Sequence, residues 1–322
     1  ETLQAVTAMD PDAFSWHGNL EHYYATGWEN MVWAIMTGIT WIAVCMVGPW
    51  QSSRYLMAKN EHVVIRSSCV AAFFVALIEF FMLTVGAFIL KFQPDIPSPS
   101  YAMIWAAVNL LPVGLGVIVL TGILAAGISS ATTFLSLIGS SFAYDLFKTD
   151  DERRTLRTGR LAIAGASLIT LLLAIFNPPN IYIIMCLSGT VVVCAWFPVC
   201  IASIWSKRVT KTGAFCGMLL GFSGCAVMKI YIEVSGTTLP IFLDPFFVGL
   251  ALNISGIVIG SMVTQVTSEE YAMRQKLLLQ PKAELDGKQI KVTKRFLLGY
   301  IASGALILYM LLFMWAIPYA QM

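Results

Sequence analysis

The chain contains few charged residues. Of its 322 residues, 12% are Asp, Glu, Lys or Arg and 58% are hydrophobic, whereas about 25% of a typical soluble domain is charged. No soluble core of this length needs so much apolar surface. The composition therefore excludes a soluble globular protein and predicts an all-α, polytopic membrane helical bundle.

The sequence also lacks the patterns of metal sites and hydrolases. Its seven cysteines are scattered in or beside apolar stretches and none forms a CxxC pair, which favours a role as small side chains in helix packing. The three histidines lie in polar segments without ligand spacing. GxSxG, HExxH and a repeated pore ring are absent as well. We therefore expect neither an enzyme nor a channel, and no nucleic-acid partner.

What the sequence does contain is long apolar stretches. Eight of them have about the 20 residues that a helix needs to cross the hydrocarbon core. They cover residues 28–50, 66–90, 113–145, 157–176, 181–206, 213–234, 245–265 and 296–317. The longer polar stretches are residues 1–27, 91–101 and 266–295. The pattern predicts about eight transmembrane helices, joined mostly by short loops.

The basic residues predict the orientation. All of the 20 Lys and Arg residues except Lys91 and Lys229 fall in alternate loops, which the positive-inside rule places in the cytoplasm. Residues 1–27 carry four acids and no Lys or Arg, so we expect an external loop there. The chain then starts outside without a signal peptide, and an odd number of further spans is expected before Glu1.

The third stretch carries a group of hydroxyl side chains. Ala126, Ser129 and Ser130 are spaced i, i+3 and i+4, so they share one helix face. The Ala126 carbonyl and two hydroxyls can converge on a monovalent cation, as in transporter sodium sites. Thr132 and Thr133 continue the oxygens one turn on. Alternatively, these side chains bond back to the i−4 carbonyl or pack against neighbouring helices.

Three segments resemble the sodium:solute symporter family. Residues 125–147 read AAGISSATTFLSLIGSSFAYDLF, similar to the family helix in which small and hydroxyl pairs precede an Asp, here Asp145. Residues 51–59 (QSSRYLMAK) match a family segment in which Ser53 stands where members often have Gln. Residues 205–217 (WSKRVTKTGAFCG) match its basic inner loop. The resemblance covers nearly the whole chain from about residue 25.

This resemblance implies a leucine-transporter-like core of two inverted five-helix repeats with added peripheral helices. Residues 28–206 would form the second repeat, and residues 207–322 three peripheral transmembrane helices with a cytoplasmic loop at 266–295. That loop is either a solvated linker or a surface helix that binds lipid headgroups. The chain would be a fragment whose partner is the missing N-terminal repeat. The expected location is the plasma membrane, as a multi-pass protein of a bacterial inner membrane.

The resemblance also implies the sites. Ala126, Ser129 and Ser130 would supply half of a sodium site, and carbonyls of a broken helix in the missing repeat the other half. Thr132 and Thr133 occupy the positions that hold a second sodium in some members.

In the first stretch, Thr37, Thr40 and Trp41 occupy the positions that face the substrate in the family. Gly38 would let the helix unwind there and expose carbonyls. A small-residue packing face with an aromatic filling a gap is the alternative. Glu79, in the second stretch, is a functional candidate because an intramembrane acid is costly. It would pair with the missing repeat, relay a proton or line a vestibule, unless it is a structural, hydrogen-bonded Glu.

The function predicted from these features is sodium-coupled symport, importing a small polar organic solute by alternating access. A membrane ligand-sensing or binding module built on a transporter-like bundle is the alternative.

Overall fold

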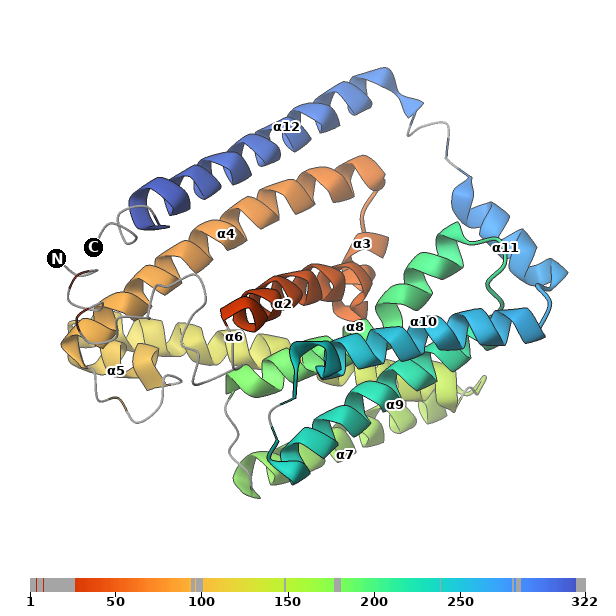
Figure 1. The fold of residues 1–322 in the computed structure, drawn as a ribbon, viewed down its shortest axis with the longest axis horizontal. Helices are drawn as coiled ribbons and strands as arrows, with labels where there is room; N and C mark the ends of the chain where they lie inside the picture. The colour runs from red at the N-terminus through yellow and green to blue at the C-terminus, as the bar shows by residue number, and fades with distance from the viewer. Residues whose placement is uncertain are drawn as a thin grey trace. The chain divides into compact units, whose positions relative to one another are not determined.

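The computed structural model describes residues 27–93, 96, 101–147, 149–176, 181–237, 239–279, 281 and 285–316, together with residues 4 and 8. The predicted external loop 1–27 lies almost entirely outside these residues. All regular secondary structure in the described part of the chain is helical, as predicted (Figure 1).

The chain is a succession of long helices joined by short ones. The long helices are α2 (Gly27–Val47), α4 (Glu61–Phe92), α6 (Val113–Ser140), α7 (Glu152–Phe176), α8 (Ile181–Trp205), α9 (Lys211–Ser235), α10 (Pro245–Val263) and α12 (Gly287–Met310). The short ones are α3 (Pro49–Leu56), α5 (Ala102–Asn109), η3 (Ser141–Leu146), η4 (Ile241–Leu243), α11 (Ser268–Leu278) and η6 (Leu311–Ala316). Eight described helices are long and apolar enough to span a membrane, which confirms the predicted number.

Two of the helix starts that differ from the hydropathy prediction show that caps, and not apolar residues, set them. Helix α12 begins nine residues before the predicted span, where the Asp286 carboxylate accepts a hydrogen bond from the Lys288 N–H. Helix α4 begins five residues early, where Asn60 accepts from the Val63 N–H at 2.9 Å. Side-chain oxygens at these positions satisfy N–H groups that lack an intrahelical partner.

The first span stops at Gly48, where α2 gives way to α3. Gly48 is extended (φ −62°, ψ 127°) and Pro49 follows as the first residue of α3. A Cβ atom on Gly48 would lie 2.7 Å from the Val44 carbonyl oxygen. Only glycine therefore fits this close bend without a shift of the neighbouring atoms.

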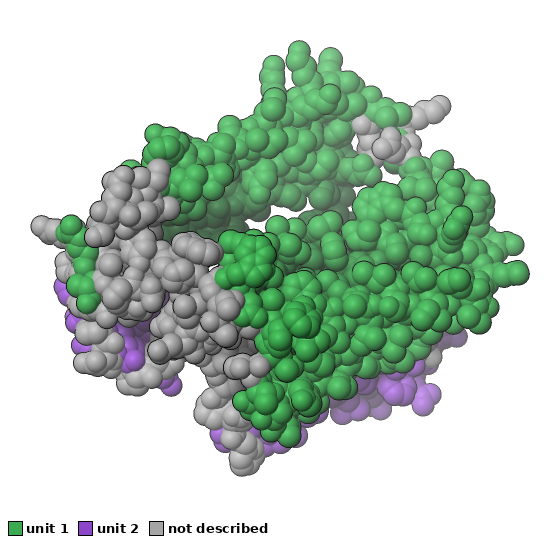
Figure 2. All heavy atoms as spheres, in the orientation of Figure 1, with its two compact units in different colours: residues 1–91, 186–322 green, residues 92–185 purple. Residues whose placement is uncertain are grey.

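The described residues form two compact units, coloured separately in Figure 2. Unit 1 contains residues 1–91 and 186–322, and unit 2 contains residues 92–185. These units do not follow the predicted boundary at residue 206, and the assignment of residues 28–206 to one repeat stays a prediction.

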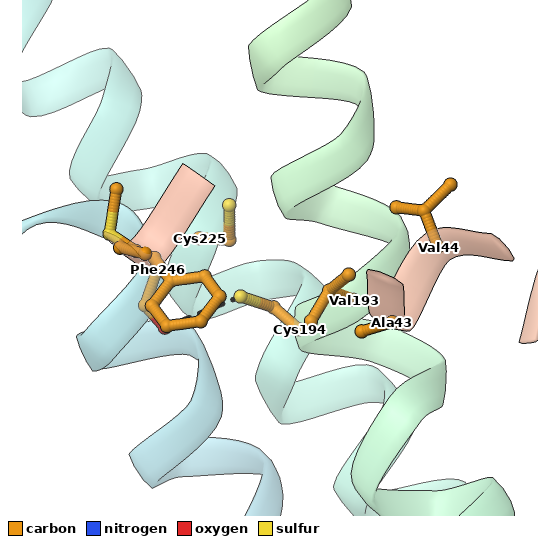
Figure 3. Close-up of a cluster of buried hydrophobic side chains, with 7 residues drawn as sticks. Ala43, Val44, Val193, Cys194, Cys225 and Phe246 are labelled. Atoms are coloured by element: carbon orange, nitrogen blue, oxygen red, sulfur yellow. Dashed lines mark hydrogen bonds between the residues drawn. The ribbon is translucent and has the colours of Figure 1, made fainter. Parts of the chain in front are cut away.

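The core of unit 1 joins four helices (Figure 3). Ala43 and Val44 of α2, Val193 and Cys194 of α8, Cys225 of α9 and Phe246 of α10 are buried together. The Cys194 thiol donates to the Phe246 carbonyl at 3.4 Å. All seven cysteines are free, and these two act as small core side chains, as the sequence predicted for the cysteines in general.

Glycines bring α9 against its neighbours. Buried glycines recur along α9 at residues 213, 217, 221 and 224. A Cβ on Gly217 would lie 2.5 Å from the Ile257 side chain, and one on Gly256 would lie 2.9 Å from the Cys216 carbonyl oxygen. Close backbone approach between small residues is a principal source of packing energy between membrane helices, and α9 and α10 form the most extensive helix pair in the described structure.

Helix α10 replaces a hydrogen bond that a proline removes from α8. Pro198 lies inside α8 and has no N–H, so the Cys194 carbonyl four residues earlier loses its helical donor. The buried Asn253 amide of α10 donates instead to the Cys194 and Ala195 carbonyls, at 2.6 and 2.9 Å. A Cβ on Gly221 of α9 would clash with the same Cys194 carbonyl oxygen. Helices α8, α9 and α10 therefore meet at one polar contact, in which the Asn253 NH2 group donates while its Oδ1 has no partner among the described residues.

Candidate functional site

The predicted ion-binding residues lie on a continuous stretch of α6. Ala126, Ser129 and Ser130 are helical and exposed. Every residue of α6 from 121 to 132 is exposed as well, so within unit 2 no described segment covers the middle of this helix. The three residues share one face, as their spacing predicts.

The two ends of α6 are held by its neighbours in unit 2. Near the start, a Cβ on Gly116 would clash with the Ala107 carbonyl of α5. Near the end, a Cβ on Gly139 would lie 2.8 Å from the Ile163 side chain and 3.2 Å from the Gly159 carbonyl oxygen of α7. Within unit 2, helix α6 is therefore packed at both ends and uncovered between them.

The threonines and the serines of α6 behave differently. Thr132 and Thr133 both donate their hydroxyl protons to the Ser129 carbonyl, at 3.0 and 2.9 Å. This is the back-bonding alternative of the sequence analysis. The Ser129 and Ser130 hydroxyls make no hydrogen bond within the described part of the chain. The hydroxyls of these two serines therefore remain available to bind another group.

This arrangement suits a sodium ion. A hydroxyl oxygen coordinates a cation through its lone pairs, so the back-bonded Thr132 and Thr133 keep acceptor capacity. Hard cations collect about six oxygens, and one helix face supplies only part of such a shell. Carboxylates are absent from this face, and the neutral oxygens match a monovalent cation better than a divalent one.

The predicted substrate residues of α2 divide between two environments. The Thr37 hydroxyl donates to the Trp33 carbonyl at 2.9 Å. Thr40 is 4% exposed, and its methyl group lies 3.4 Å from the position of a Cβ on Gly189 of α8. Trp41 is 36% exposed. The structure thus brings Thr40 against α8 and leaves Trp41 on a more open side of the helix.

The α2 backbone is helical throughout this region. The helix runs through Gly38 to Val47, so the predicted unwinding at Gly38 is not a feature of this structure. The Thr40 hydroxyl is buried and has no partner among the described residues. A buried hydroxyl without a hydrogen-bond partner costs free energy. Of the two threonines, Thr40 is therefore the stronger candidate for contact with a bound solute.

The acidic candidates lie exposed on their helices. Glu79 of α4 and Asp145 of η3 are exposed, and neither makes a salt bridge or hydrogen bond within the described residues. Lys148, three residues after Asp145, lies outside that part of the chain. The roles proposed for Glu79 stay predictions.

Sequence reasoning missed the polar contacts between distant helices. Asn253 to Cys194 is one. Another joins α4 and α12: the His62 ring contacts the Thr293 hydroxyl at 2.9 Å, and Arg66 donates to the Thr293 hydroxyl and the Gln289 side chain. The sequence does show Pro198 and Asn253 inside apolar stretches and Arg66 at the edge of one. It does not show which residue each of them contacts.

The comparisons with known proteins decide the family. The sodium:solute symporter family profile matches residues 4–221 of the chain. The chain belongs to the sodium:solute symporter family. It is thus related to multi-pass transporters, which agrees with its eight apolar helices.

Two curated relatives are similar over part of the chain. An uncharacterized symporter of Cupriavidus necator is 27% identical over 128 residues, which are 38% of this chain and 19% of the relative. The high-affinity proline transporter PutP of Bacillus subtilis is 28% identical over 155 residues, 47% of this chain and 32% of the relative. The chain therefore spans less than a third of either relative in the matched regions. No solved structure matches it significantly.

Proposed function

We propose that this symporter-family chain takes part in sodium-coupled import of a small polar organic solute by alternating access. The observation that carries the proposal is the pair of serine hydroxyls, Ser129 and Ser130, exposed in the middle of a membrane-spanning helix without a hydrogen-bond partner among the described residues. Lipid offers hydroxyls no partner. Coordination of sodium, together with the Ala126 carbonyl, gives them one.

The remaining oxygens come, in this proposal, from a segment outside this chain. The exposed middle of α6 supports this view, as does the greater length of the relatives. Residues 28–206 are proposed as the second repeat and residues 207–322 as peripheral helices. Sodium would tie α6 to the missing repeat and stabilise the outward-open state, and its release to the cytoplasm would loosen that tie. Thr132 and Thr133 are proposed ligands of a second sodium.

The solute is proposed to bind near Thr37, Thr40 and Trp41 of α2. The name of the Bacillus subtilis relative makes proline the first solute to test. The plasma membrane is the proposed location.

The test uses the protein as the cell makes it, reconstituted in proteoliposomes. Solute uptake is measured against external sodium for Ser129→Ala and Ser130→Ala. Each substitution is expected to raise the half-saturating sodium concentration about tenfold, equal to about 1.4 kcal/mol of sodium binding. Ser136→Ala is the matched control, because that hydroxyl already donates to the Thr133 carbonyl at 2.9 Å. Wild-type sodium dependence in both site variants would sink the sodium assignment.

A further inference from the structure

The cytoplasmic end of α12 is a cationic surface that the proposed transport cycle does not use. Four basic side chains lie within its first nine residues, all of them exposed: Lys288, Lys291, Lys294 and Arg295. None of these four forms a salt bridge with another described residue. The nearest acid along the chain, Asp286, serves as the cap of α12.

A fifth cation comes from α4. Arg66 donates through Nε to the Thr293 hydroxyl at 3.0 Å, and through Nη2 to the carbonyl and side-chain oxygens of Gln289, at 2.8 and 2.6 Å. All three acceptors are neutral, so the Arg66 charge is held in place without being neutralised by them. His62, also on α4, contacts the same Thr293 hydroxyl.

These contacts fix the depth of the cations. They join the first turns of α4 and α12, the two ends that the positive-inside rule places in the cytoplasm. Exposed apolar side chains follow at once, with Ile65 on α4 and Phe296 and Leu298 on α12. The residues from Lys288 to Arg295 span about 10 Å of helix, enough to cross one headgroup layer of about 5 to 8 Å.

We propose that the cytoplasmic ends of α4 and α12, with Arg66, Lys288, Lys291, Lys294 and Arg295, bind the headgroup of an anionic phospholipid. Clustered Lys and Arg beside a membrane helix attract acidic lipids. The phosphate accepts hydrogen bonds from lysine ammonium groups and from the guanidinium N–H groups that Arg66 and Arg295 leave free. The acyl chains lie along the exposed apolar faces that follow. A zwitterionic lipid adds a cation to the same surface and binds less well.

The test measures lipid binding by the purified full chain rather than transport. Native mass spectrometry counts phosphatidylglycerol and phosphatidylcholine retained by the wild type and by a variant with Lys288→Gln, Lys291→Gln, Lys294→Gln and Arg295→Gln. Phosphatidylglycerol retention is expected to fall at least about tenfold in the variant, since each lost cation weakens the attraction. Phosphatidylcholine retention is expected to stay as it was.

Two control variants separate the loss of these charges from misfolding and from a general loss of positive charge. Replacing the three lysines with Arg preserves the charge and is expected to preserve retention, which separates binding from any folding defect of the glutamine variant. Lys207→Gln with Arg208→Gln removes cytoplasmic charge from the α8–α9 loop and is expected to change little. Equal retention in wild type and glutamine variant would overturn the proposal, leaving these charges as orientation signals. Displacement of the lipid by inorganic phosphate alone at equal concentration would also overturn it.

Discussion

The α8–α9–α10 bundle and the α6–α7 hairpin have similar apolar composition but different packing. In the most apolar 18-residue segment of each helix, 28% of the residues of α8, 22% of those of α9 and 28% of those of α10 are buried. The corresponding share is 6% in α6 and zero in α7. The bundle buries its glycines against backbone, whereas α6 has glycines, such as Gly122 and Gly127, with nothing within 4 Å of an added Cβ.

Their polar side chains differ in the same way. Asn253 is fully buried, and its amide repairs a break in the neighbouring helix. Ser129 and Ser130 are exposed and repair nothing. The comparison shows two situations for a polar side chain in an apolar helix. Asn253 makes hydrogen bonds to a neighbouring helix, whereas the Ser129 and Ser130 hydroxyls make none within the described residues and can bind a partner from outside them. Only the contacts distinguish the two situations.

The largest expected effect comes from filling a glycine in the bundle. Gly221→Leu puts a side chain where the Cys194 carbonyl and Asn253 lie, and overpacking of this kind costs about 3 kcal/mol. Thermal unfolding in detergent measures the loss. Gly122→Leu on α6 is the comparison in the purified chain without further segments, where nothing lies within 4 Å of an added Cβ, and it is expected to change the free energy of unfolding by less than about 0.5 kcal/mol. Equal losses from both substitutions in that preparation would contradict the difference in packing.

The next effect tests the capped proline break. Asn253→Ala leaves the Cys194 and Ala195 carbonyls without their donor and is expected to cost about 2 kcal/mol. Pro198→Ala restores a backbone N–H for Cys194, so Asn253→Ala is expected to cost about 1 kcal/mol less in that background. A double-mutant cycle of unfolding free energies measures the coupling. Strict additivity would show that Asn253 does not compensate for the proline.

A smaller stability effect is expected on α6. Ser129→Ala and Ser130→Ala remove hydroxyls that bond to nothing among the described residues, so unfolding without sodium is expected to change by less than about 0.5 kcal/mol. Stabilisation by added sodium is expected to diminish in both variants, because a ligand that binds only the folded state stabilises it. A melting-temperature series against sodium measures both quantities. A large loss of stability without sodium would indicate a structural role instead.

The smallest effect concerns the pH dependence of the contact between the start of α11 and the start of α9. Hydrogen bonds from the backbone N–H groups of Thr267 and Lys211 lower the pKa of the Glu270 carboxyl below its usual value of 4.5. A lowered folded-state pKa means that this contribution to stability is present above pH 4.5 and is lost as the pH falls through the folded-state pKa. Acidification is therefore expected to loosen the start of α11.

Hydrogen exchange of the α11 amides measures that loosening between pH 6 and pH 3, after correction for intrinsic exchange rates. Glu270→Gln, which does not titrate, is expected to remove this part of the pH dependence. A pH response unchanged by Glu270→Gln would assign it to another group.

The loop 266–295 shows where prediction from the sequence stopped. The sequence left a solvated linker and a surface helix open, and the structure forms α11 with a capping box of Thr267 and Glu270. Arg274 donates to the Val209 carbonyl of the α8–α9 loop. The box is readable in the sequence as T-x-x-E, but the docking is not, because Arg274 and Val209 are 65 residues apart.

The sequence by itself determined the helical class, the eight spans, the expected orientation and the shared face of Ala126, Ser129 and Ser130. These follow from hydropathy, charge distribution and helical spacing, which depend on residues close together in the chain. Three contacts were decided only by the tertiary structure. Asn253 donates to the carbonyl that Pro198 leaves without a donor, Thr40 packs against Gly189, and Arg66 donates hydrogen bonds to α12. Such pairs depend on which helices meet, and the apolar surface that drives a helix into the membrane is the same whichever neighbour it later finds.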